Sequence, residues 1–551
     1  MRQASEIHPD DTPKGVGWLG ARLGMGRRRR APAMLVVPAL ATAAVVNLPL
    51  VYLGIRASQN GFDSWLDAVS TPFVGGLITR TLLLVIGVVA LAILVAVPLA
   101  WLVTRTDLPG RRLWAVLGAM PLVFPSYVSA YALVAVLGPR GFAQSWLRVE
   151  RLPDIAYGYS GALLTLALFT YPYIYLPLVG TLRSLDPALE DSSRALGVGR
   201  WRTFFAVVLP QLRLPILAGA LLVALYTLSD FGGVAIVRYN TFTLAVYNAY
   251  TSLHDRTMAA SLAVVLVLLT LVLLALEAFL GRRNRPTRQR PSRPPELIPL
   301  GRWRWPVLAG IGSWSVLTVG MPLGVVTYWG IRGLFAGRDL ERAGNAVIGS
   351  LTVSLIAAVC AAVLALPIAV WSVRHRNQLS RVTERLSYAG YALPGLVIAL
   401  AMVFFATRAV PMFYQTLPIL VLAYVIRFLP EATASTRASL TAVAPAFEEA
   451  ARSLGQSPWR VLRTVTLPMI LPGITAGAGL VFLTSMKELP ATLLLQPTGY
   501  RTLATDIWTF ASEGFYTSAS LPALALLIAT APPLYYLTIR PALQRRTSRQ
   551  P

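Results

Sequence analysis

Twelve long apolar segments constrain the fold of this 551-residue chain more than any other feature. A helix that crosses a bilayer needs about 20 largely apolar residues. The segments lie at approximately 33–55, 78–103, 113–137, 159–182, 212–236, 259–280, 305–330, 346–372, 386–407, 415–436, 470–488 and 519–539. Only 13% of the residues are charged, against about 25% in a soluble domain. We therefore predict an all-α integral membrane protein with about twelve transmembrane helices.

The loops between these segments alternate in arginine content. The arginine-rich loops are 22–30, 105–112, 183–211, 281–304, 373–385, 437–469 and 540–549, and the intervening loops are poorer in arginine and richer in acids. Basic loops stay on the cytoplasmic side of a membrane. The pattern predicts a multi-pass protein with both termini in the cytoplasm. The net charge of +25 is placed to face anionic membrane lipid, so we expect no nucleic-acid partner.

The two halves of the chain resemble each other. Pro98 and Pro125 of the first half recur as Pro367 and Pro394, and Thr243-Leu-Ala recurs as Thr502-Leu-Ala. Both halves have six segments and start on the same side, which predicts a parallel repeat with a path between the halves. The predicted parts are a basic N-terminal segment (1–32), a first repeat (33–280), an Arg/Pro-rich linker (281–304), a second repeat (305–540) and a tail (541–551).

One polar pattern occurs in the same arginine-rich loop of each half. The copies run Asp191-Ser-Ser-Arg-Ala-Leu-Gly197 and Glu449-Ala-Ala-Arg-Ser-Leu-Gly455, and each is followed after the same interval by Leu-Pro. Each copy predicts a short helix with acids in its first turn and a glycine at its end. Local ion pairs would explain a single helix, but they do not explain the same spacing in both halves.

This pattern resembles the glutamate-alanine-alanine signature of permease subunits of ATP-binding-cassette importers. The second copy follows the signature, and the first departs from it at Asp191-Ser192-Ser193. The resemblance implies the type I importer permease fold, fused from two units, in a bacterial inner membrane. It also implies that each loop docks on one of two separate ATPase subunits, and that an extracytoplasmic solute-binding protein delivers the substrate. The implied coupling residues are Glu190, Asp191, Gly197, Leu209, Pro210, Glu448, Glu449, Ala450, Ala451, Gly455, Leu467 and Pro468.

Several strings resemble the fused permeases for ferric iron. They include Ser229-Asp-Phe-Gly-Gly233, Lys487-Glu-Leu-Pro-Ala-Thr492 and Ala392-Leu-Pro-Gly-Leu396. Fused permeases for thiamine and for phosphonates share the architecture and remain alternatives for the substrate. A secondary transporter or channel that needs no ATPase is the alternative from another class.

Three ionisable residues are candidates for the translocation path: Asp230, Lys487 and Glu488. Asp230 and Glu488 each follow the Leu-Pro proline of their half by 20 residues, so we expect two carboxylates to face each other and to pass a hard cation. The alternatives are a Lys487–Glu488 pair or solvated side chains. The tyrosines at 127, 131, 171, 173 and 175 could also line a path, although an interfacial aromatic belt is the expected role for most of them.

The sequence predicts no chemistry of its own. Neither lysine, Lys14 or Lys487, lies in a P-loop, so ATP hydrolysis is expected in partner subunits. Cys360 is the single cysteine, and the three histidines are scattered. We therefore expect no catalytic residue, no cofactor and no resident metal site.

Overall fold

The computed structural model describes residues 32–58, 61–139, 141–148, 154–186, 188–282, 297–335 and 340–534. The predicted tail (541–551) lies outside these ranges, as do residues 1–31 of the predicted N-terminal segment and 283–296 of the predicted linker. Within the described ranges the chain is helical, and the β structure consists of one isolated bridge between Thr106 and Ile298.

The helices of the first half, up to residue 282, follow one another along the chain. They are α1 (Ala33–Ser58), α2 (Phe62–Val69), α3 (Pro72–Arg105), α4 (Arg111–Leu117), η1 (Met120–Val123), α5 (Ser126–Leu137), α6 (Phe142–Leu147), α7 (Gly158–Thr170), α8 (Pro172–Ser184), α9 (Ala188–Ala195), α10 (Arg200–Thr203), η2 (Phe204–Val208), α11 (Leu209–Gln211), α12 (Arg213–Ser229), α13 (Gly232–Ile236), α14 (Phe242–Thr251) and α15 (Arg256–Arg282).

The second half repeats this order with small changes. Its helices are η3 (Gly301–Trp303), α16 (Arg304–Ser315), η4 (Val316–Gly320), α17 (Met321–Phe335), α18 (Leu340–Arg374), α19 (Gln378–Ser387), α20 (Ala389–Ala392), α21 (Gly395–Ala409), η5 (Pro411–Phe413), α22 (Leu417–Ala442), α23 (Ala446–Ser453), α24 (Pro458–Val461), η6 (Leu462–Thr466), α25 (Leu467–Met486), α26 (Pro490–Leu495), α27 (Leu503–Ser512) and α28 (Tyr516–Leu534).

The described helices account for the predicted membrane spans, but some spans are broken. Eight helical stretches are long and apolar enough to cross a membrane, and three bent helix pairs raise the number to eleven. The predicted span 519–539 corresponds to α28 and runs beyond the described residues. The predicted spans 113–137 and 386–407 are bent by 100° and 102°. Each bend lies at a proline, Pro125 or Pro394, because proline cannot donate to the helical ladder and restricts the residue before it.

Two further predicted helices end earlier than expected. The span 212–236 stops at Ser229, and the span 470–488 stops at Met486. After a short break, each continues as a separate short helix, α13 or α26. The prediction of continuous helices is wrong here, because Asp230 and Glu488 hydrogen-bond to backbone N–H groups of the following helix and start it in a new direction.

The Leu-Pro pairs of the repeated loops have a structural role that spacing alone did not show. One wide π turn, η2, ends at Val208, two residues before Pro210, and another, η6, ends at Thr466, two residues before Pro468. A third, η4, stands in the same relation to Pro322. Proline removes a donor and crowds the preceding turn, and a π turn lets the helix continue past it.

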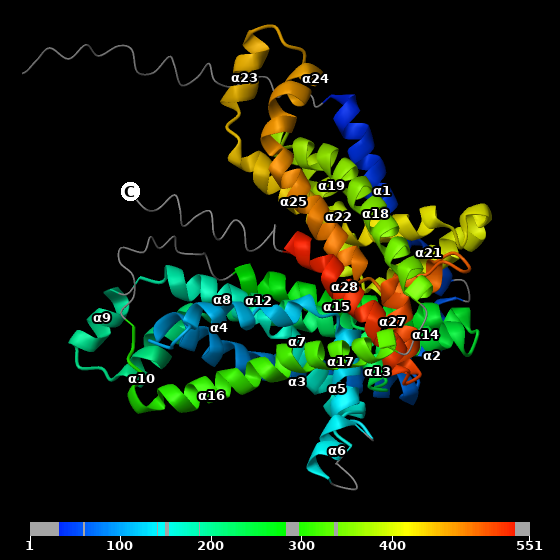
Figure 1. Ribbon diagram of the computed structural model, residues 1–551. Coiled ribbons are helices and arrows are strands. Elements are labelled where there is room, and N and C mark those ends of the chain that lie inside the picture. The colour runs from blue at the N-terminus through cyan, green and yellow to red at the C-terminus, as the bar shows by residue number, and fades with distance from the viewer. Residues whose placement is uncertain are drawn as a thin grey trace, which may run out of the picture.

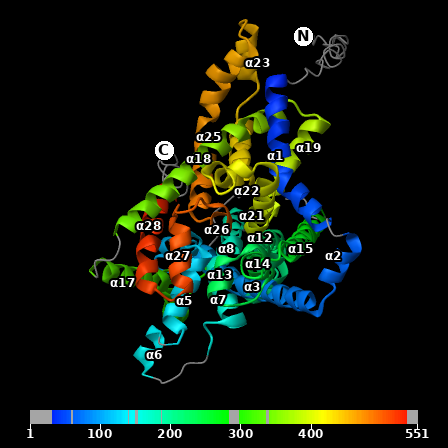
Figure 2. The ribbon, with the colours of Figure 1, turned by 90° about the vertical axis from the view of Figure 1, so that its right-hand side faces the viewer.

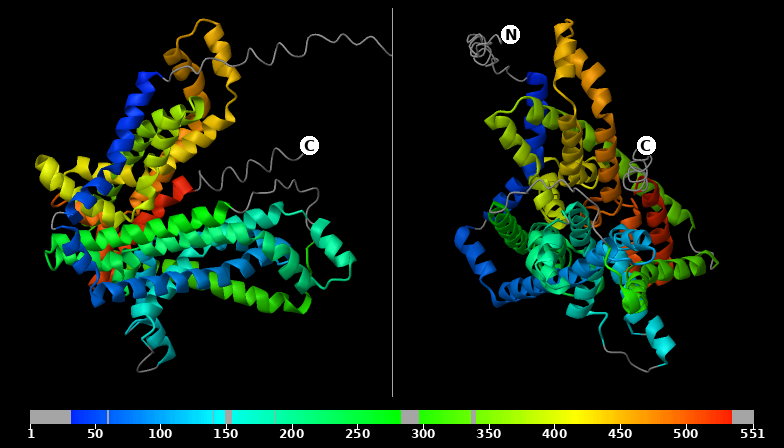
Figure 3. Two further views of the ribbon diagram at one scale, coloured as in Figure 1. Left: turned by 180° about the vertical axis from the view of Figure 1, so that it is seen from behind. Right: turned by 90° about the vertical axis from the view of Figure 1, so that its left-hand side faces the viewer.

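The two halves form two arms that diverge from a shared centre (Figure 1). Helices α3, α8 and α12 pack together in the first arm, which ends at α9, and α18, α22 and α25 pack together in the second, which ends at α23. The view from behind shows the same divergence, and the view from the left-hand side shows the second arm rising above the first half (Figure 3).

Each half places its first helix on the other half. Helix α1 packs against α18, α19 and α21 of the second half, as Figure 2 also shows. In the opposite direction, Trp314 of α16 stacks edge-on against Tyr171, with ring centroids 5.8 Å apart. The chain before α16 is tied down as well, because Leu300 N donates to Asp107 Oδ1 at 2.8 Å. The predicted repeats are therefore interlocked in space.

The starts of α14 and α27 correct one of the residue correspondences that the sequence predicted between the two halves. Thr241 and Thr502 are the N-caps of α14 and α27, two helices of ten residues each. The next residue of each helix donates its backbone N–H to a hydroxyl of a long helix, Thr81 or Ser350. Thr502 therefore corresponds to Thr241, and the recurring Thr-Leu-Ala triplets are two residues out of register.

Candidate functional site

The repeated loops form matching short helices at the ends of the two arms. In both, the terminal glycine adopts a left-handed conformation, with φ of 79° at Gly197 and 81° at Gly455. Each glycine N–H donates to an arginine carbonyl three residues earlier, at Arg194 or Arg452. A residue with a Cβ is strained in this conformation, which explains why glycine ends both helices.

The first acid of each loop points inward and pairs with a long helix. Arg374, the last residue of α18, donates Nε to Glu448 Oε1 at 3.0 Å. Arg105, the last residue of α3, lies 3.0 Å from Glu190 Oε1. These acids are also paired within their own helices to Arg452 and Arg194, at 3.5 and 3.8 Å. The ion pairs are therefore not only local, as sequence analysis had allowed, but join α9 and α23 to the membrane helices.

The second acid of each loop faces outward. Asp191 and Glu449 are exposed, and so is Ala450. The leucine before each glycine is more exposed still, with Leu196 84% and Leu454 82% accessible. The two leucines therefore occupy the same repeat position and are exposed to the same degree.

The remaining predicted coupling residues lie deeper. Leu209, Pro210 and Leu467 are half-buried and follow the π turns, so they shape the return into the membrane. Pro468 is exposed at the same bend. Ala451 is a half-buried residue of α23.

In the first loop, a second substitution accompanies the serine that departs from the signature. Ser193 stands where the second copy has Ala451, and its hydroxyl lies 3.1 Å from the Thr203 hydroxyl. Thr203 in turn replaces Val461, and both are buried. A polar pair in the first loop thus replaces an apolar pair in the second, and the helix keeps its place.

A histidine lies beside the second loop without adding charge to it. His375 follows Arg374 at the end of α18. Burial, and then the charge of Arg452, lower the pKa of His375 below its usual value. The imidazole is therefore neutral at neutral pH, and the cationic partners of Glu448 are the two arginines.

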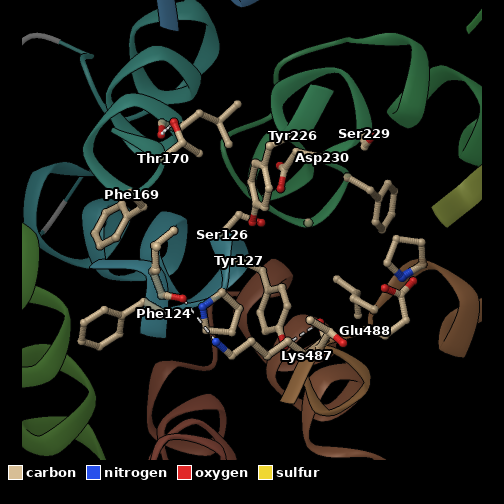
Figure 4. Close-up of a pocket in the computed structure, with 18 of the residues that line it drawn as sticks. Phe124, Ser126, Tyr127, Phe169, Thr170, Tyr226, Ser229, Asp230, Lys487 and Glu488 are labelled. Carbon is tan, nitrogen blue, oxygen red and sulfur yellow. Dashed lines mark hydrogen bonds between the residues drawn. The ribbon is translucent and has the colours of Figure 1, made fainter. Parts of the chain in front are cut away.

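A cavity of about 270 Å³ lies between the two halves, and all three predicted path residues line it (Figure 4). Asp230 and Tyr226 come from the first half, and Lys487 and Glu488 come from the second. The lining residues carry hydroxyl, phenol and carboxylate oxygens, and they include no histidine, cysteine or methionine.

The two carboxylates of the cavity are engaged as helix caps. Asp230 Oδ2 accepts from Gly233 N at 3.0 Å and from Val234 N at 3.2 Å. Glu488 Oε1 accepts from Ala491 N at 3.2 Å, the equivalent bond in the other half. Both carboxylates line the cavity, as expected, and each also starts a helix. Their role in passing a cation stays a prediction.

Glycines allow the halves to meet at this cavity. A Cβ on Gly232 would lie 2.9 Å from the Leu489 side chain of the other half and 2.9 Å from Cβ of Tyr127. A Cβ on Gly233 would lie 2.8 Å from the capping oxygen of Asp230. The string Ser229-Asp-Phe-Gly-Gly233 thus combines a cap with the close approach of two backbones.

The cavity also holds a charged residue that was not among the predicted path residues. Arg427, on α22, donates Nη1 to Glu488 Oε1 at 3.1 Å. Glu431, one turn further along, accepts from the Thr484 hydroxyl at 3.1 Å. Both residues interrupt the apolar segment 415–436, and ionisable residues inside a span are themselves a signal of function. Lys487 pairs with neither acid, and its Nζ donates to the Leu122 carbonyl at 3.3 Å.

The five tyrosines do not form an interfacial belt. Tyr127 and Tyr173 line the cavity. Tyr131, Tyr171 and Tyr175 are fully buried, and the Tyr175 hydroxyl donates to the Ala115 carbonyl at 3.1 Å. The prediction of a belt is wrong because these tyrosines lie on faces that pack against neighbouring helices.

Comparison with known proteins agrees with this geometry. The family described as binding-protein-dependent transport system inner membrane component matches residues 31–286 and matches again at residues 346–547. This chain belongs to that family. It is therefore a multi-pass inner-membrane permease subunit built from two family units, and the alternative of a secondary transporter or channel is set aside.

Known permeases resemble this family member along its whole length or along one half. The Fe(3+)-transport system permease protein FbpB 2 of Haemophilus influenzae is 32% identical over 92% of this chain and 98% of the relative. The ferric transport system permease protein FbpB of Actinobacillus pleuropneumoniae is 24% identical over 72% of this chain. The molybdenum transport system permease protein ModB of Escherichia coli is 32% identical over 37% of this chain and 94% of the relative. This last alignment covers 37% of the chain, whereas the family model matches two separate stretches of it.

Proposed function

We propose that this permease imports ferric iron that an extracytoplasmic solute-binding protein delivers to its outer face. The observation that carries the proposal is the 32% identity to the Haemophilus influenzae ferric permease over 92% of this chain. The cavity lining carries phenol, hydroxyl and carboxylate oxygens together with the cations Lys487 and Arg427. Ferric iron is the cargo here, not a resident cofactor.

Two ATPase subunits supply the energy in this proposal, and the permease itself catalyses no reaction. One subunit docks on α9 and the other on α23, where Leu196 and Leu454 are exposed at equivalent positions. The arginine-rich loops then face the cytoplasm together with both chain termini. The ion pairs that Glu190 makes with Arg105 and that Glu448 makes with Arg374 transmit the movement of each ATPase to α3 and α18.

Alternating access follows from the two-armed shape. ATP binding draws the ATPases together and brings the ends of the two arms closer, and the central cavity changes the side to which it opens. In this proposal Asp230, Lys487 and Glu488, which line the cavity between the halves, lie on the path of the cargo. The predicted repeats 33–280 and 305–540 act as the two moving units, with α1 and α16 exchanged between them.

Transport in a reconstituted system tests this proposal. The permease, its ATPase and its binding protein are placed in proteoliposomes, and the uptake of ⁵⁵Fe(III) from the loaded binding protein is measured with and without ATP. We expect ATP-dependent accumulation of iron. Accumulation of thiamine or a phosphonate instead, with no iron, would refute the substrate and leave the importer mechanism intact.

A further inference from the structure

Lys487 lines the central cavity, and its ammonium group has more hydrogen-bond donors than described acceptors. Its ammonium group has three N–H donors, and the one hydrogen bond that the described residues give it runs to the Leu122 carbonyl at 3.3 Å. No described ion pair within 4.0 Å involves it. The side chain is half-buried and lines the cavity that both halves share.

The acids around the cavity are occupied by other donors. Glu488 is held by Arg427 and by the N–H of Ala491. Asp230 accepts two backbone N–H groups of α13. Glu431 is outside the lining, accepts from the Thr484 hydroxyl, and lies one helical turn from Arg427. Lys487 therefore has no carboxylate partner among the described residues, and its one described hydrogen bond leaves two ammonium donors unassigned beside the cavity.

The charge of Lys487 has no counterpart in the first half. Asp230 and Glu488 cap equivalent helices, so the residues that precede them, Ser229 and Lys487, are also equivalent. Both line the cavity. The first half has an uncharged serine at this position, whereas the second half has an ammonium group in a region where a charge is costly.

We propose that Lys487 binds an anionic oxygen group of the cargo, so that the cavity passes an oxyanion or a ferric ion covered by an anionic oxygen ligand, and not a bare cation. A bare trivalent ion would be repelled by Lys487 and Arg427, and the nearest carboxylates are already hydrogen-bonded. An anionic oxygen would instead accept the free ammonium donors in a charge-assisted bond. The ferric form of this inference rests on the proposed function, and the free-oxyanion form does not.

Two labels and three variants test the inference in proteoliposomes with the ATPase and the binding protein. The binding protein is loaded with ⁵⁵Fe(III) in buffer containing [³²P]phosphate. The variants are Lys487→Met, Lys487→Arg and the control Arg408→Met, which removes an exposed cation from the end of α21. Thermal melting of each purified variant checks the fold, and ATP-dependent uptake of both labels is measured.

We expect Lys487→Met to lower uptake by about tenfold, and Lys487→Arg to restore most of it, with Arg408→Met at the wild-type rate. Iron and phosphate entering together identify a ferric complex as the cargo. Phosphate entering without iron, and lost in Lys487→Met, supports a free oxyanion and refutes the ferric proposal. Wild-type uptake by Lys487→Met, or a loss that arginine does not restore, overturns the inference while iron uptake by the wild type still supports the proposed function. If neither label enters with the wild type, both proposals fail.

Discussion

The guanidinium group of Arg427 occupies the space where a side chain on residue 395 would stand. A Cβ at Gly395 would lie 1.2 Å from Arg427 Nη1 and 2.9 Å from Glu488 Oε1. In the first half, Ser126 follows Pro125 at the position that Gly395 holds after Pro394. In the second half, the absence of a side chain at Gly395 leaves space for the guanidinium group of Arg427, which pairs with Glu488.

Gly395→Ala should displace Arg427 and separate it from Glu488. We expect a loss of about 1–3 kcal/mol in the free energy of unfolding, with transport reduced further because the cavity wall moves. Gly324→Ala is the control, since a Cβ at that position in α17 meets nothing within 4 Å. Thermal melting and uptake are compared for both variants, and wild-type uptake by Gly395→Ala would contradict the assigned position of Arg427.

Glu448 and Glu449 are adjacent acids with different surroundings, so their variants should behave differently. Glu448→Gln leaves the half-buried Arg374 with an uncompensated charge, and we expect it to destabilise the protein by about 3 kcal/mol. Glu449→Gln changes an exposed side chain, and its effect on stability should stay within about 0.5 kcal/mol. Chemical or thermal unfolding of the two variants distinguishes the roles, and equal losses would disprove the inward ion pair.

Removing the charge of Asp230 should impair the protein less than removing its side-chain oxygen atoms. Asp230→Asn retains an acceptor for Gly233 N, whereas Asp230→Ala removes the cap of α13 and costs about 1 kcal/mol. We expect near-native uptake from Asp230→Asn and a clear loss from Asp230→Ala. If the two variants lose uptake equally, the carboxylate charge itself is required, and the capping role does not explain the residue.

Local patterns predicted much of this fold. Segment length and hydropathy located the membrane helices, and the repeated loops ended in left-handed glycines as their sequence indicated. Part of what the patterns missed depends on contacts between distant residues, namely the buried tyrosines and the pairing of Arg427 with Glu488 within the second half. The breaks at Asp230 and Glu488 are local, because each carboxylate accepts from a backbone N–H three residues later. Arg427 was nevertheless visible as a charge inside an apolar segment.

The exchange of first helices could not be read from the sequence either. The segments 33–55 and 305–330 carry apolar side chains all round, so hydrophobicity does not indicate which neighbour each one meets. Specific contacts decide this, such as Trp314 against Tyr171 and the bond from Leu300 N to Asp107. A repeat boundary drawn along the chain therefore differs from the boundary between the packed units.

Docking of the ATPase on both repeated loops is the central claim, and capture of the ATPase by the purified permease tests it most directly. Leu196→Asp and Leu454→Asp are combined in one variant, and Leu253→Asp, which alters an exposed leucine in the loop after α14, is the control. We expect the double variant to melt like the wild type and to lose the ATPase, because the proposed docking would bury each leucine, and an aspartate in its place would be a buried, unpaired charge. The control should retain the ATPase. Stoichiometric binding of the ATPase to the double variant would contradict the account.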